Sequence, residues 1–90
     1  MEDPNIIRKI SFIKRSKNRL KLISIIDDSF KTPTDIATVM DLRVNQISAI
    51  LSDLKKENIV VCINKKEKTG RLYQLTPEGK EAYNMIKTNQ

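Results

Sequence analysis

The sequence predicts a mainly helical fold with one small β-hairpin, an α+β domain formed by a chain of 90 residues. Three observations support this prediction. Apolar residues recur at the three- and four-residue spacing of amphipathic helices in several segments. Cap residues followed by proline mark where helices begin. A β-branched run, 59–63 (IVVCI), is separated by a charged loop from an alternating segment, 71–75 (RLYQL), as in a hairpin. The length suits one domain over residues 1–90.

Two helices are predicted before residue 27. Asp3 and Pro4 form a start signal for the first, in which apolar residues at helical spacing fall on one side. Ser16 can cap the second. The apolar residues are Ile6, Ile7, Ile10 and Ile13 in the first helix and Leu20, Ile23 and Ile26 in the second.

A helix, a tight turn and a longer helix follow. Thr32, Pro33 and Asp35 supply an N-cap, a first helical residue and the acid of a capping box, so residues 32–40 should be helical with Ile36, Ala37 and Met40 buried. Asp41 tolerates the left-handed conformation that a turn over 41–43 needs. The next helix, ending near Asn58, should bury Val44, Ile47, Ile50, Leu51 and Leu54.

The hairpin and a last helix complete the domain. Gly70 lets the charged loop 64–70 turn back, and Tyr73 and Leu75 should point to the core. Thr76, Pro77 and Glu78 should begin a last helix that buries Ala82, Tyr83 and Ile86. Cys62, inside an apolar run, is expected to be an ordinary core residue.

This order of elements is that of a winged helix-turn-helix domain. The stretch TPTDIATVMDLRVNQISAILSDLKKENIVVCINKKEKTGRLYQLTPEGK resembles the winged-helix transcription regulators of the ArsR/MarR-like type, in a small archaeal form. The similarity extends over residues 15–86, and RSKNRLKLI, LKKENIVVCI and GRLYQLTPEGK are its most specific parts. It implies sequence-specific binding of double-stranded DNA by a homodimer that represses or activates transcription. The chain departs from the family pattern at Asp41, Arg43 and Ala49.

Positive charge is concentrated in two segments. Residues 8–21 hold seven basic side chains and no acid, and residues 55–71 hold six against two acids. Such blocks suit a polyanion, although two solvated faces would give the same counts.

We predict that these basic segments and the long helix from Val44 bind DNA. Opposite its apolar stripe, the helix from Val44 carries amide and small side chains, which suit adenine and thymine and predict an A/T-leaning site. Each assignment has an alternative. The helix face can be an ordinary polar surface, Arg43 an incidental surface charge, Thr32 and Thr34 helix caps only, and the hairpin tip a solvated loop. The candidate base-reading residues are Arg43, Asn45, Gln46, Ala49 and Ser52; the backbone-binding ones are Arg15, Lys17, Arg19, Thr32, Thr34, Ser48 and Lys56; the wing residues are Lys65, Lys66, Lys68 and Arg71.

Other chemistry finds little support. The chain has no histidine and one cysteine, and it shows no nucleophile motif or glycine-rich phosphate loop, so no enzyme, metal or cofactor is predicted. It lacks a long apolar run, which predicts a cytoplasmic protein with no membrane partner. The sequence identifies no small-molecule effector.

Two other functions remain possible. A winged helix can also be a protein-interaction module in a larger nucleic-acid-processing assembly, but such a module does not need two basic blocks. Binding of RNA or single strands would favour exposed aromatics, whereas Phe12, Phe30, Tyr73 and Tyr83 fit core or interface positions.

A homodimer is expected to form through the terminal segments 1–14 and 77–90. A two-fold interface would cover apolar residues at both ends of the domain, although covering them within one chain is possible. The predicted interface residues are Ile6, Ile7, Ile10, Ile13, Tyr83 and Ile86.

Overall fold

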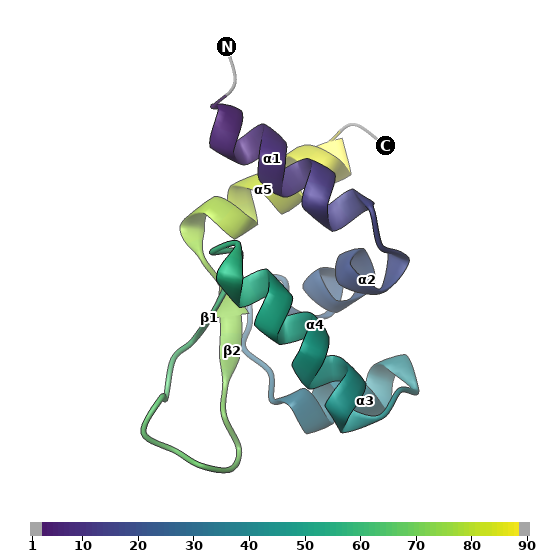
Figure 1. Ribbon diagram of the computed structural model, residues 1–90, viewed down its shortest axis with the longest axis vertical. Coiled ribbons are helices and arrows are strands. Elements are labelled where there is room, and N and C mark those ends of the chain that lie inside the picture. The colour runs from purple at the N-terminus through teal and green to yellow at the C-terminus, as the bar shows by residue number, and fades with distance from the viewer. Residues whose placement is uncertain (1–2, 89–90) are drawn as a thin grey trace.

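Five helices and one antiparallel hairpin follow one another in the predicted order over residues 3–88, the part of the chain that this computed structural model describes (Figure 1). The outermost residues of the predicted dimerisation segments, 1–2 and 89–90, lie outside it. The elements are α1 (Pro4–Lys14), α2 (Lys17–Ile26), α3 (Pro33–Met40), α4 (Val44–Lys56), β1 (Val60–Cys62), β2 (Tyr73–Leu75) and α5 (Pro77–Thr88).

Each of the first three helices begins directly after the N-cap residue that the sequence predicts. Asp3 Oδ1 accepts a hydrogen bond from the Asn5 N–H at 2.9 Å, and Ser16 Oγ accepts one from the Arg19 N–H at 3.3 Å. Thr32 and Asp35 form the capping box, with side chain and backbone paired in both directions at 3.1 and 3.4 Å. Each cap stabilises its helix by about 1 kcal/mol. These local signals therefore place the helix starts correctly.

The turn between α3 and α4 has the predicted conformation. Asp41 is left-handed, with φ 56° and ψ 45°, and the Leu42 N–H donates to the Ala37 carbonyl at 3.1 Å. This closure of the α3 end lets α4 start three residues later and lie across α3.

The core lies where α2 meets the other helices and the hairpin. In Figure 1 α1 lies along α5 at one end of the molecule, and α3 packs on α4 toward the other end. The predicted stripe of α3 is buried, as are Ile47, Leu51 and Leu54 of α4 and also Cys62. The side chains with almost no exposure are Ile13, Leu22, Ile23, Ile26, Ile36, Ile47, Leu51, Leu54, Ile59 and Val60.

The hairpin pairs in one register, with Val60 opposite Leu75 and Cys62 opposite Tyr73. Its loop turns back at Gly70, whose φ of 65° suits glycine. Lys31 adds a further bridge to Tyr73, because its N–H and carbonyl both pair with the Tyr73 backbone, at 3.0 and 2.9 Å. No pattern in the sequence indicates this contact, which joins the segment before α3 to the hairpin.

Thr76 caps the last helix, as predicted. Its Oγ1 accepts a hydrogen bond from the Gly79 N–H at 2.9 Å and donates to the Asn58 carbonyl at 2.7 Å. One hydroxyl therefore caps α5 and fastens it to the end of α4. Gly79 faces the backbone of Ile59 so closely that a Cβ would lie 2.1 Å from the Ile59 carbonyl oxygen.

Two side chains of the predicted α4 stripe, Val44 and Ile50, are less buried than predicted. Val44 is 44% exposed because it stands in the first turn of α4, at the edge of the contact with α3. Phe30, expected in the core or an interface, lies outside the core and is 55% exposed in the loop between α2 and α3. Ile7 is 48% exposed because it turns away from α5, whereas Ile6 and Ile13 turn toward the core.

Most of the predicted interface residues are covered within one chain. Because α1 packs on α5, Ile6, Ile13, Tyr83 and Ile86 join the single core. The expectation that they need a partner surface is therefore wrong for these four. Ile10 is partly buried, and Ile7 remains at the surface.

Candidate nucleic-acid interface

Helix α4 presents the polar face that the sequence predicts. Asn45, Ala49, Ser52 and Lys56 are exposed, while the apolar stripe on the other side of the helix is buried. Short side chains in the middle of this face let another surface come close to the helix backbone. The face therefore has the shape and the amide and hydroxyl groups that a helix needs to approach base edges in a major groove.

Gln46 has a structural partner that the sequence analysis missed. Its Oε1 accepts a hydrogen bond from the Arg43 N–H at 3.0 Å, which caps the start of α4 from the third helical position. The Arg43 side chain makes no cap hydrogen bond of its own and is exposed. The signal was present in the sequence, since glutamine at this position is half of a capping box.

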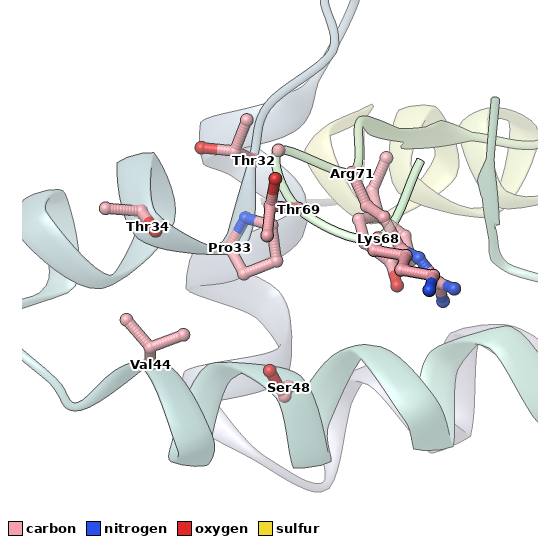
Figure 2. A pocket seen from close by; sticks show the side chains of 10 residues that line it. Thr32, Pro33, Thr34, Val44, Ser48, Lys68, Thr69 and Arg71 are labelled. Carbon is pink, nitrogen blue, oxygen red and sulfur yellow. The ribbon is translucent and has the colours of Figure 1, made fainter. Parts of the chain in front are cut away.

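A hollow of about 520 Å³ joins the start of α3, the first turns of α4 and the hairpin. Figure 2 shows Val44 and Ser48 on the side of α4 that faces Pro33 and Thr34. The structure thus brings together three groups of candidates that are far apart in the sequence. The hollow is lined by Thr32, Pro33, Thr34, Val44, Ser48, Lys68, Thr69, Gly70, Arg71 and Tyr73.

The wing, residues 63–72, is an exposed basic loop with an internal frame. Asn64 closes its base, because its Nδ2 donates to the Gly70 carbonyl at 3.1 Å and its Oδ1 accepts from the Leu72 N–H at 2.7 Å. Arg71 Nε donates to the Glu67 carbonyl at 2.9 Å. These bonds shape the loop that carries the exposed side chains of Lys65, Lys66 and Lys68.

The first basic segment, by contrast, is partly engaged inside the fold. Arg19 Nη1 donates to the Phe12 carbonyl at 3.0 Å, and its guanidinium lies 3.8 Å from the centre of the Phe12 ring. Arg8 pairs with Glu57 through two contacts of 3.2 and 3.3 Å. The sequence predicts a DNA-backbone contact for Arg19 and does not indicate its contact with Phe12.

Arg15 and Lys17 are exposed but do not line the hollow beside the wing. Arg15 instead borders a second hollow, of about 470 Å³, with Arg8, Ser11, Phe12 and Glu57. Figure 1 shows α1 at the end of the molecule away from the hairpin tip. The structure therefore joins α3, α4 and the wing into one surface and leaves the first basic segment apart from it.

Within residues 3–88, no group of three or more His, Cys, Asp or Glu side chains is placed to hold a metal ion. Over the same residues, none of the helices has the length and apolar character needed to cross a membrane.

Comparisons with known proteins give matches among solved structures. No protein-family model and no curated protein matches the chain. The homodimeric winged helix-turn-helix DNA-binding domain (fragment 1–100) of Mb0332 from Mycobacterium bovis, a possible ArsR-family regulator, is 16% identical, with a TM-score of 0.78 over 93% of this chain and 77% of that one. HlyU from Vibrio cholerae is 18% identical, with a TM-score of 0.79 over 99% and 97% of the two chains.

A structure with bound DNA is also similar. The S. aureus MepR–DNA complex is 12% identical, with a TM-score of 0.74 over 93% of this chain and 71% of that chain. Identities this low establish the architecture alone. Together with the order of helices and hairpin, they show that the chain has the winged helix-turn-helix fold that its sequence predicts.

Proposed function

We propose that the protein binds double-stranded DNA in a sequence-specific manner as a homodimer and regulates transcription, as an ArsR/MarR-like regulator acting in the cytoplasm. The observation that carries this proposal is the surface on which the start of α3, the first turns of α4 and the basic wing border one hollow, with the exposed polar face of α4 beside it. The similar structures include a homodimeric DNA-binding domain and a DNA complex, which supports the same function. The three similar structures described above come from bacteria, so they lend no support to an archaeal form.

In this function α4 enters the major groove. Asn45 and Ser52 are exposed and can reach base edges, Ala49 allows close approach, and exposed Arg43 lies at the helix start. Gln46 contributes mainly through the cap that it provides.

The hollow beside α4 suits the DNA backbone. Thr34 is exposed in the first turn of α3, where backbone N–H groups lack partners inside the helix, and Ser48 faces it from α4. The exposed lysines of the wing supply positive charge on the other side. A phosphate strand running between them would meet hydroxyls, N–H groups and cations at once.

For the homodimer, we propose that the outward face of α1 around Ile7 and Ile10 forms the interface, together with the exposed face of α5. Ile6, Ile13, Tyr83 and Ile86 hold α1 against α5 and build the platform beneath that face. A two-fold arrangement would bring two α4 helices to successive major grooves, about 34 Å apart.

The salt dependence of duplex binding tests the proposal. If the dimer contacts six to ten phosphates, log affinity should fall with log salt with a slope of about −5 to −9. Lys66→Ala should make this slope smaller by about one unit per monomer and weaken binding to selected and random duplexes alike. Lys21→Ala, which removes the same charge from the exposed side of α2, is the matched control. A slope near zero for the wild type would rule out this mode of binding.

A further inference from the structure

Val44 is an apolar side chain at the surface of the proposed reading helix. It occupies the first position of α4 and is 44% exposed, although Ile47, one turn further on the same stripe, is fully buried. The hollow around it is otherwise lined mainly by hydroxyl and basic side chains. Its branched methyl groups therefore stand at the rim of a polar, positively charged surface.

Val44 lines the hollow that the proposed duplex would border, beside the polar face of α4. Figure 2 shows Val44 and Ser48 one turn apart on the side of α4 that faces Pro33 and Thr34. Ser48 is exposed, and the next residue after Val44, Asn45, lies on the polar face of the helix. Val44 is thus next to the reading face, at the end of the helix that begins beside α3.

Duplex DNA offers one apolar group in the major groove that matches such a side chain. This group is the C5-methyl of thymine, which cytosine lacks and which uracil also lacks.

We propose that Val44 is a specificity-determining residue that contacts the C5-methyl of a thymine in the preferred duplex, beneath the first turn of α4. This inference rests on the proposed function and adds a particular contact to it. Methyl-to-methyl contact excludes water from both groups and should change affinity by about three- to fivefold per methyl removed.

The experiment combines a change in the protein with a change in the DNA. Duplexes are first selected by the full chain from a random pool, and each thymine of the selected site is then replaced in turn by deoxyuridine, which keeps base pairing and removes the methyl. Wild type and Val44→Ala are compared on every duplex. At one thymine per half-site, the replacement should weaken wild-type binding about three- to fivefold and Val44→Ala binding hardly at all.

Two further variants separate this contact from general effects. Val39→Ala removes methyl groups from another exposed valine, 59% exposed on α3 and outside the hollow, and should retain the wild-type response to deoxyuridine. Val44→Thr keeps one methyl and serves if Val44→Ala unfolds, with an intermediate response expected. Circular dichroism and urea unfolding establish that each variant is folded.

The outcomes are distinct. If every deoxyuridine replacement weakens wild type and Val44→Ala by the same factor, Val44 does not read thymine and instead contacts sugar or contributes only to folding. A selected site without thymine in the half-site would also overturn the inference, although the proposed function would stand. Absence of any duplex binding by the wild type would overturn both.

Discussion

The side-chain Oε1 of Gln46 accepts a hydrogen bond from the backbone N–H of Arg43, 3.0 Å away, and so closes the start of the helix proposed to read DNA. Arg43 lacks the side-chain oxygen with which serine, threonine or aspartate would cap this helix. Gln46 supplies the reciprocal half of a capping box in its place. The residue beside it, Asn45, makes no comparable contact in the described part of the chain and is exposed.

Gln46→Ala and Asn45→Ala should therefore differ. Loss of the cap should lower the free energy of unfolding by about 0.5–1 kcal/mol and leave base preference unchanged. Asn45→Ala should leave stability unchanged and cost about 1–3 kcal/mol on a selected duplex, with little loss on random DNA. Urea unfolding and binding to selected and random duplexes measure the two effects. A changed base preference for Gln46→Ala would show that its amide also reads bases.

Gly79→Ala should destabilise the fold, although alanine favours helices elsewhere. A Cβ at this position would lie 2.1 Å from the Ile59 carbonyl oxygen, which also accepts a hydrogen bond from the Thr76 N–H at 3.0 Å. To relieve this contact, the backbone of α5 or of Ile59 would have to shift at the junction of α4, β1 and α5. The expected loss is about 1–3 kcal/mol, measured by urea unfolding.

Asn84→Ala is the control for this position, because it introduces alanine on the exposed side of the same helix. It should be neutral or slightly stabilising, by up to about 0.5 kcal/mol. Equal stability of Gly79→Ala and wild type would mean that α5 can shift away from the hairpin.

The sequence predicts local structure well in this chain because the helix starts use side chains close in sequence. Ser16, Thr32 with Asp35, and Thr76 each bond a backbone group within three residues, so their patterns could be recognised without the fold. Contacts between distant segments gave no such signal. The bridge from Lys31 to Tyr73 is formed by backbone atoms, which every residue has.

Site residues were predicted less completely than the fold. Helical spacing alone places Val44 on the apolar stripe, but burial depends on where α3 ends, which spacing does not reveal. Net charge likewise does not show that Arg19 is held by Phe12 while Lys66 is exposed on a loop. Charge counts indicate that the chain can bind a polyanion. Which basic side chains are exposed for this and which pack inside the fold depends on the tertiary structure.

Arg19 should act on stability more than on DNA binding. Its guanidinium both bonds the Phe12 carbonyl at 3.0 Å and stacks on the Phe12 ring at 3.8 Å, joining α1 to α2. Arg19→Ala should lower the free energy of unfolding by about 1–2 kcal/mol. Arg19→Lys keeps the charge without the planar fork and should recover less than half of this loss. Full recovery of DNA affinity by Arg19→Lys after a loss in Arg19→Ala would instead indicate a phosphate contact.

The proposed dimer depends on the face of α1 that the single chain leaves open. Ile7 is 48% exposed in the single chain, so Ile7→Asp should leave the monomer folded while placing a charge in an apolar interface. Ile13 is fully buried, so Ile13→Asp should unfold the domain by burying an unpaired carboxylate. In sedimentation at tens of micromolar, the wild type should run as a dimer and folded Ile7→Asp as a monomer. A monomeric wild type would exclude the dimer at this concentration. A dimeric Ile7→Asp would place the interface on another face, because an apolar contact cannot accommodate an unpaired carboxylate at its centre.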